Sequence, residues 1–276
     1  MSFLNLCNDD PLLKVLKDAL KANPIRIPEE RIKPLIVLSK QGNNNKFIGD
    51  IKNLLENNTH VDIPIENSQM ADISSTRSKK IDASLGLQVL DNFLKGFGSK
   101  AASIEFAFNG AKTISFSFDN VQRQYIDLGT LGKVLVQKKV DISNPVIQNF
   151  IEEKSECIIL DSVITSNNFS IRVEDEYSTG FSFNIPEINK VLSSLNNDIK
   201  VSSSSSLEIT FNGSKQLAFA FTCLLVNIDD EGHISFDGEP DKMTLTKEPV
   251  TNYPQFNCEK YILNENFGLN YIDFDE

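Results

Sequence analysis

Apolar and polar side chains alternate with a period of two along two long parts of the chain. In the first part the alternation covers residues 81–89 and resumes over residues 104–118, after a glycine-containing stretch at 95–100. A period of two predicts a β-strand with one apolar face. The apolar positions of this first region are Ile81, Ala83, Leu85, Leu87, Val89, Ile104, Phe106, Phe108, Ile114, Phe116 and Phe118.

The second alternating region starts at Phe169 and leads into a helix signal. Pro186 is suited to the first turn of a helix, and residues 187–195 place their apolar side chains on one stripe, so we expect a helix there. The alternation before it predicts a strand. Its apolar positions are Phe169, Ile171, Val173, Tyr177, Phe181, Phe183 and Ile185.

Shorter signals surround these two regions. Residues 9–23 begin with Asp-Asp-Pro and have leucines on one side and lysines on the other, which predicts a basic amphipathic helix that Asn23-Pro24 ends. Strand signals resume over residues 201–221, with a turn expected at Asn212-Gly213. The serine tract 202–206 fits either an exposed strand face or a flexible linker. Two short strands are predicted at residues 34–40 and 46–51.

The length of the alternations is unusual for a soluble protein. Strands in soluble sheets typically have five or six residues, whereas the three alternations here span nine, fifteen and seventeen residues. Membrane barrels use strands of about 9–11 residues with one face toward lipid. The pattern alone leaves two interpretations open, a twisted antiparallel sheet with one face on a core and strands that insert into a membrane.

The C-terminal part of the chain is acidic yet rich in aromatic residues. Residues 1–150 carry a net charge of +3 and residues 151–276 carry −14, of which −9 lies in residues 229–276. Disordered acidic tails usually lack aromatic side chains, so we expect the tail to lie against another surface. Residues 239–249 contain two prolines and no periodicity, and we expect a protease to cut this linker most easily.

Signals for an enzyme, a secreted protein or a nucleic-acid-binding protein are weak. The chain has two histidines, four widely spaced cysteines and no HExxH, GxSxG or GxxxxGK[ST] motif. No run of roughly 20 apolar residues predicts a membrane-spanning helix, and no secretory signal is evident at the N-terminus. Lysine and arginine do not cluster as duplex binding requires. We therefore expect a cytoplasmic protein that is not an enzyme, with no metal or dissociable cofactor.

Several segments of the chain resemble the bacterial gasdermins, the prokaryotic relatives of pore-forming cell-death proteins. The resemblance covers most of residues 25–238, and each piece is a loose pattern. Its pieces are Ala71-Asp72-Ile73-Ser74 with Thr76-Arg77-Ser78, the amphipathic run Ser84–Gly98, Ala111–Phe118, Ile164–Val173, Phe183–Ile188 and Phe211–Phe221.

This resemblance implies an α+β fold with a strongly twisted antiparallel β-sheet core and flanking helices. Residues 1–238 would be the pore-forming domain, residues 239–255 a protease-sensitive linker and residues 256–276 an inhibitory tail. The partner would be a protease, often caspase-like and encoded nearby, that cuts the linker. The body, a monomer until then, would oligomerise on the lipids of the inner membrane and form a large β-barrel pore that kills the cell, typically in response to phage.

The resemblance also assigns candidate residues. Lys79–Phe118 and a part of Ile164–Phe211 would insert into the membrane, with the apolar positions at 81–89 (except Ala83), 104–118 and 169–173 facing lipid. Cys7 would carry a palmitoyl chain as the only covalent group, whereas Ser2 excludes myristoylation. The residues preceding the cut would be Lys242, Leu245 or Lys247. The tail would dock through Phe256, Tyr261, Ile262, Phe267, Leu269, Tyr271 and Phe274.

Two other classes of function remain open from the residues themselves. A β-rich interaction or scaffold protein could use the acidic tail to recruit a partner, and removal of the tail would then abolish only that binding. A hydrolase with unrecognised carboxylates would instead lose turnover on replacement of a single Asp or Glu.

Overall fold

The computed structural model describes most of the chain between residues 22 and 236, in two compact units. Unit 1 takes described residues from 1–33, 67–124 and 163–221, and unit 2 takes those from 34–66, 125–162 and 222–276. The strands β8 (Glu156–Val173) and β10 (Glu208–Ile228) contribute to both units. The described residues are 22–41, 44–56, 61–70, 77–78, 80–135, 138–174, 181–195 and 198–236.

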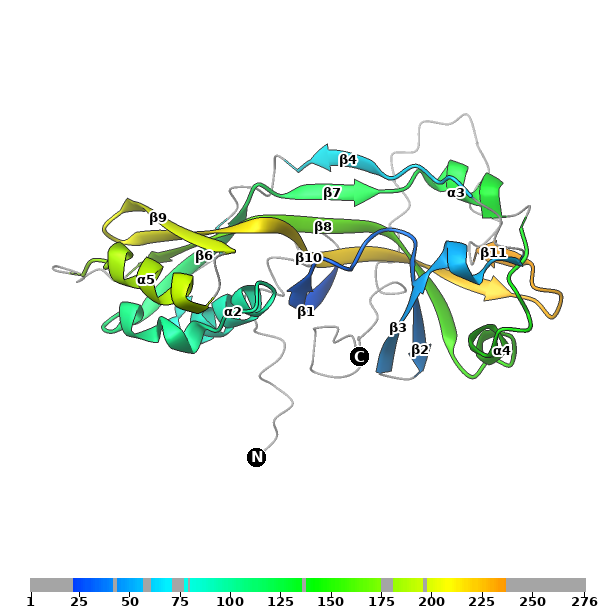
Figure 1. The fold of residues 1–276 in the computed structure, drawn as a ribbon, viewed down its shortest axis with the longest axis horizontal. Coiled ribbons are helices and arrows are strands. Elements are labelled where there is room, and N and C mark those ends of the chain that lie inside the picture. The colour runs from blue at the N-terminus through cyan, green and yellow to red at the C-terminus, as the bar shows by residue number, and fades with distance from the viewer. Residues whose placement is uncertain are drawn as a thin grey trace, which may run out of the picture. The chain divides into compact units, whose positions relative to one another are not determined.

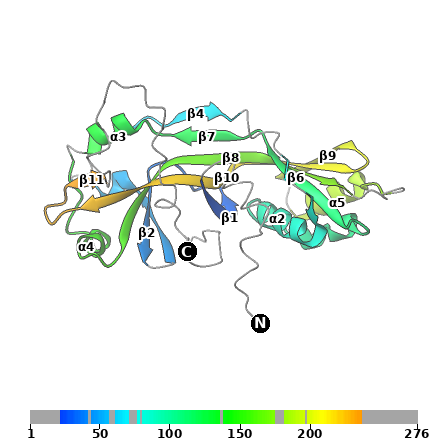
Figure 2. The ribbon, with the colours of Figure 1, turned by 180° about the vertical axis from the view of Figure 1, so that it is seen from behind.

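Unit 1 is an antiparallel sheet with helices beside it (Figure 1). Its strand order is β1-β10-β8, and β6 also pairs with β8. Figure 2 shows the same arrangement from behind, with α2 and α5 beside β6 and β9. Its strands, besides β8 and β10, are β1 (Asn23–Glu29), β4 (Glu66–Gln69), β5 (Ile81–Asp82), β6 (Thr113–Asp119), β7 (Gln122–Tyr125) and β9 (Ile199–Ser205); its helices are α2 (Ala83–Lys95), α5 (Ile185–Leu195) and the 3₁₀ helices η4 (Ala101–Ser103) and η5 (Glu105–Phe108).

Helix α2 begins at a polar cap and buries one face. The Asp82 carboxylate accepts a hydrogen bond from the Ser84 backbone N–H at 2.8 Å, which satisfies one of the free donors at the helix start. The helix ends at Gly96. Its buried residues recur at helical spacing and are Ala83, Gly86, Val89, Leu90, Phe93 and Leu94.

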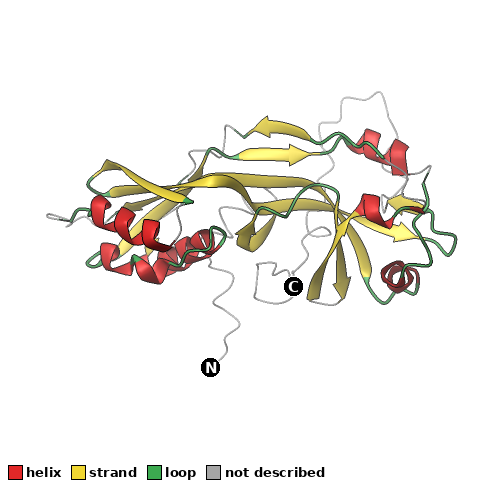
Figure 3. Ribbon diagram, in the orientation of Figure 1, coloured by secondary structure: helices red, strands yellow, loops and turns green. Residues whose placement is uncertain are grey.

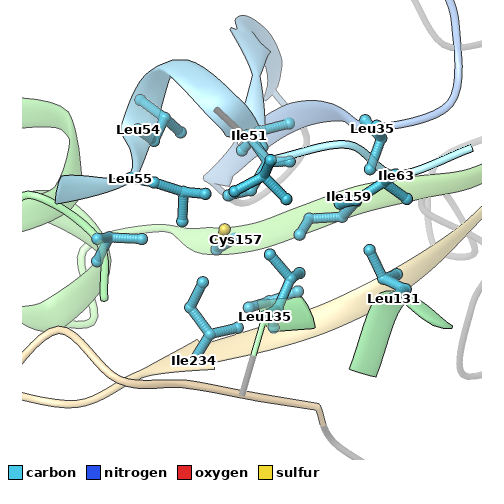
Figure 4. Close-up of a cluster of buried hydrophobic side chains, with 14 of the residues drawn as sticks. Leu35, Ile51, Leu54, Leu55, Ile63, Leu131, Leu135, Cys157, Ile159 and Ile234 are labelled. Carbon is cyan, nitrogen blue, oxygen red and sulfur yellow. The ribbon is translucent and has the colours of Figure 1, made fainter. Parts of the chain in front are cut away.

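Unit 2 has the strand order β10-β8-β2-β3 and its own apolar core. Figure 4 shows side chains of this core, with Leu135 from α3, Ile159 from β8 and Leu35 from the turn before β2. Helix α4 starts at Asn144, whose side chain accepts from the Val146 N–H at 3.0 Å, with a proline in its first turn. The elements confined to unit 2 are β2 (Ile36–Gln41), β3 (Asn44–Asp50), β11 (Ile234–Phe236), η2 (Ile51–Leu54), α3 (Leu128–Leu135) and α4 (Pro145–Ile151).

The α+β class and the antiparallel sheet are confirmed, as Figure 3 shows with strands and helices in separate colours. The helix predicted after Pro186 is confirmed as α5. The short strands at 34–40 and 46–51 correspond to β2 and β3, and the serine tract lies largely in the exposed part of β9.

The strand predicted at residues 81–89 is wrong, because α2 starts at Ala83. The strand predicted over 104–118 is wrong for its first part, since Ile104–Phe108 lies at and within η5 and only Thr113–Asp119 forms β6. In both cases apolar residues four apart are buried, Val89 with Phe93 and Ile104 with Phe108, and this tertiary packing prevails over the period of two.

Two further expectations need correction. The turn at Asn212-Gly213 is wrong because β10 continues through it. The alternation that began at Phe169 ends as a strand at Val173, and residues 181–184 are not in a strand. Strand β1 begins at Asn23, the residue at which the predicted helix is expected to end. The other residues of the predicted helix at 9–23 lie outside the described ones, Ala22 excepted, and the linker and the tail lie wholly outside them.

Candidate membrane-inserting regions

The first predicted region is folded as short helices between two strands of unit 1. Ile81 lies in β5, Leu85, Leu87 and Val89 lie in α2, and the aromatic pair Phe106 and Phe108 lies in η5. Leu85 is 42% exposed and Phe106 is 38% exposed, so these two apolar side chains face solvent. Ile81 and Leu87 are half-buried. The buried members of the region are Val89, Ile104, Phe108, Ile114, Phe116 and Phe118.

The second predicted region pairs directly with the first. Strand β8 runs antiparallel to β6 and places each of its three candidates opposite a candidate of the first region. All six side chains are buried. The cross-strand pairs are Ile114 with Val173, Phe116 with Ile171 and Phe118 with Phe169. Apolar faces that were predicted separately from the two alternations therefore form one continuous surface.

Helix α2 covers this surface with aromatic side chains. The ring of Phe93 stacks on that of Phe169, with centroids 5.2 Å apart and an interplanar angle of 25°. Phe97 contacts Phe93 edge to face at 5.2 Å, and Phe219 of β10 stacks on Phe118 at 4.4 Å. Such pairs add to the stabilisation that area burial provides.

The sequence analysis missed Phe93, Phe97 and Phe219 as part of this cluster. Val89, Phe93 and Phe97 recur every fourth residue, and together with the apolar Leu90 and Leu94 at the other parity they form a helical signal. The sequence therefore contains the signal for Phe93 and Phe97. The stacking of Phe219 on Phe118 is a long-range contact that no sequence pattern predicts.

The other side of β6 and β8 carries small polar residues that are also buried. Ser115, Ser117 and Ser170 are at most 3% exposed. The Ser170 hydroxyl donates to the Asp119 carboxylate at 2.7 Å and lies 2.9 Å from the Thr210 hydroxyl, and the Ser115 hydroxyl donates to Glu174 at 2.7 Å. Because buried hydroxyls need partners, these hydrogen bonds allow a polar face to stay covered in the folded protein.

Helix α5, which follows the second region, is held by backbone contacts to β9. The Asn189 side chain accepts from the Val201 N–H at 3.0 Å and donates to the Val201 carbonyl at 3.1 Å. Ile188 and Leu192, which lie on one side of α5, are fully buried. Extension of the second region as a strand would break these contacts.

Three of the carboxyl groups with a lowered pKa serve local capping. Hydrogen bonds from the side chains of Ser84, Thr130 and Ser143 lower the pKa values of Asp82, Asp127 and Asp141. Each acid lies two or three residues before its partner, the pattern of turns and helix starts. Among the residues described, no cluster of three or more His, Cys, Asp or Glu side chains could hold a metal ion. Within the same residues, no helix is both long and apolar enough to cross a bilayer.

Two of the four cysteines lie in the described residues, and both are buried. Cys157 and Cys223 are buried, and burial raises the pKa of each thiol to about 12. Because the thiolate is the reactive form, we expect iodoacetamide to leave both unmodified in the native protein at about pH 8 and to modify both in urea. Peptide mass spectrometry measures this difference, and rapid native labelling of either cysteine would contradict the burial.

The remaining candidate residues lie outside the described part of the chain. They are the lipidation candidate Cys7, the cleavage candidates Lys242, Leu245 and Lys247, and the seven tail residues from Phe256 to Phe274.

Comparisons with known proteins place this fold in a family. The profile of the Bacterial Gasdermin Family matches residues 25–233. A gasdermin of Vitiosangium sp. (strain GDMCC 1.1324) is 28% identical over 243 residues, 88% of this chain and 90% of the relative. One from a Desulfuromonadales bacterium is 28% identical over 250 residues, 87% of this chain and 91% of the relative. The solved structure of a bacterial gasdermin from Bradyrhizobium tropiciagri superposes with a TM-score of 0.59 at 17% identity, over 82% of this chain and 90% of that one.

Proposed function

The chain belongs to the bacterial gasdermin family, whose members are pore-forming cell-death proteins rather than enzymes, and we propose that proteolysis switches this chain from a latent form to a membrane pore. Residues 1–238 would form the pore, residues 239–255 would be cut, and residues 256–276 would inhibit until then. The pore would open the inner membrane and kill the cell, typically in defence against phage.

The pairing of the two candidate regions in unit 1 is the observation that supports this proposal. Their apolar faces meet across β6 and β8, and α2 covers them. If these faces turned outward toward lipid, the polar face with Ser115, Ser117 and Ser170 would line the water-filled side, as in membrane barrels. Backbone groups in lipid must all be paired, so many copies would have to close into one barrel.

The N-terminal cysteine is the proposed acylation site. Cys157 and Cys223 are poor acceptors because both are buried, which leaves Cys7 and Cys258 among the four cysteines. The resemblance favours Cys7. One acyl chain anchors a protein only weakly, so it would assist insertion rather than hold the latent protein on the membrane.

The proposed trigger is a protease, caspase-like and encoded nearby, that cuts after Lys242, Leu245 or Lys247. Cutting removes the tether that keeps the tail at high effective concentration beside the body. The acidic tail would also cease to offset the net charge of +3 on residues 1–150, which favours anionic lipid. The latent monomer would be cytoplasmic and the cut form would be at the inner membrane.

A vesicle-leakage experiment on the full chain tests this function. We insert the recognition sequence of a site-specific protease after Leu245 and add the protein to dye-loaded vesicles of anionic lipid. We expect no release before the protease is added and rapid release afterwards, whereas the chain without the inserted sequence stays silent throughout. Intact vesicles after complete cutting would refute the pore and favour the interaction or scaffold protein instead.

A further inference from the structure

Helix α2 approaches the sheet of unit 1 more closely than any side chain would permit at three glycines. A Cβ atom at Gly86 would lie 1.9 Å from Ile114 Cδ1, and one at Gly96 would lie 2.4 Å from the Pro28 carbonyl oxygen. From the sheet side, a Cβ at Gly213 of β10 would lie 2.0 Å from the Phe97 ring. Contacts below 3.0 Å force a neighbour to move, so these glycines bring the two ends of the helix against β6, β1 and β10.

Two of these glycines also weaken the helix itself. Gly86 lies inside α2 and Gly96 ends it in a right-handed helical conformation, with φ −59°. Glycine is the poorest helix former after proline, and short helices depend on tertiary packing for their stability. Alanine would therefore favour the helix at either position, were it not for the close contacts. The segment stays helical because it is docked on the sheet.

The same segment is suited to a second conformation. Its helical face buries Val89, Leu90 and Phe93, while Leu85, which the period of two places on the strand's apolar face, is left 42% exposed. Leu85 gains only part of its possible burial from the helix, and it would be covered further if the segment extended as a strand on an apolar surface. Undocking therefore removes the main support of the helix and leaves the strand pattern intact.

We propose that the glycine-mediated docking of α2 is a second restraint on membrane insertion, built into unit 1 and separate from the C-terminal tail. This inference rests on the proposed function. The tail would decide when the protein is released, and the docked helix would set how fast the released protein converts. Weakening the dock lowers that barrier whether or not the tail has been cut.

Alanine substitutions that enforce the clash test this restraint. Gly96→Ala meets a backbone oxygen that cannot swing away, and Gly213→Ala meets a packed aromatic ring. Gly132→Ala is the matched control, because this glycine lies in α3 and a Cβ there meets nothing within 4 Å. Each is made in the full chain that carries the inserted protease sequence, and deuterium exchange of residues 83–95 is measured beside leakage of the same anionic vesicles.

In both test variants we expect the amides of α2 to exchange about tenfold faster than in the parent chain. Both should also release dye from the vesicles faster than the parent, before as well as after cutting. Gly132→Ala should behave like the parent in both measurements. In Gly213→Ala, the added change Phe97→Leu removes the three clashing ring atoms and should return exchange and leakage toward the parent values. Faster exchange with parental leakage would overturn the restraint, and so would parental exchange in both variants. Failure of the cut parent chain to leak would instead count against the proposed function.

Discussion

A disulfide between positions 86 and 114 is expected to keep the cut protein from leaking vesicles until the bond is reduced. A Cβ at Gly86 would lie 2.6 Å from Ile114 Cγ1, so in Gly86→Cys/Ile114→Cys two sulfur atoms can occupy the space of the isoleucine side chain. The bond ties α2 to β6. In the pore that we propose the helix must leave β6, so we expect leakage to fall to the level of the uncut chain under oxidising conditions and to recover on reduction.

Strand register explains why this bond should block the pore. Ile81 is opposite Ile114 in the β5–β6 pair. Continuing that register along an extended strand places residue 86 opposite Asn109, about five residues or 17 Å from residue 114. A disulfide needs Cβ atoms only about 3.5–4.5 Å apart, so it cannot persist in the extended hairpin.

The same register supplies the control. Ile81→Cys/Ile114→Cys links two residues that are opposite each other both in the folded sheet and in the extended hairpin, and we expect this oxidised variant to leak after cutting. Equal leakage from both oxidised variants would show that α2 stays on β6 in the active form. If neither oxidised variant releases dye and reduction restores release in both, β5 and β6 separate in the active form.

The strands of the candidate site could be predicted because their pattern reports burial directly. Phe116, Phe118, Phe169 and Ile171 alternate with small polar residues, and in the fold all four lie on one buried face. Alternation of this kind has no helical interpretation, since residues two apart lie on opposite sides of a helix. Their pairing across β6 and β8 is a long-range contact that no local pattern encodes.

Residues 81–97 could not be predicted in the same way because they satisfy two periods. Ile81, Leu85, Val89, Phe93 and Phe97 fit both a strand face and a helical repeat of four, and only the apolar Leu90 and Leu94, which have the opposite parity, decide for the helix. The Asn212-Gly213 pair failed for a related reason. Asn-Gly is a common turn sequence, but here Gly213 lies within the continuous strand β10, where the absence of a side chain lets the Phe97 ring approach the backbone.

The exposed residue Leu85 provides the second large effect, because a lysine there should leave the folded protein intact and slow its entry into a membrane. Leu85 is 42% exposed in α2, and exposed substitutions usually change the free energy of unfolding by less than about 0.5 kcal/mol. In the inserted strand the same position would face lipid. A lysine on the lipid face costs up to about 2–4 kcal/mol at the bilayer midplane, and each subunit of the ring incurs that cost.

Gln88→Lys is the matched control for Leu85→Lys. Gln88 is also exposed in α2 but has the opposite parity, so an inserted strand would turn it toward water. After cutting, we expect Leu85→Lys to release dye at least about tenfold more slowly than the parent, which corresponds to about 1.4 kcal/mol, and Gln88→Lys to release it at nearly the parental rate. Thermal unfolding of both uncut variants should match the parent within a few degrees. Equal loss in the two variants would contradict the assignment of faces, and unchanged release in both would place residues 81–89 outside the membrane, because a buried lysine in lipid cannot be free of cost.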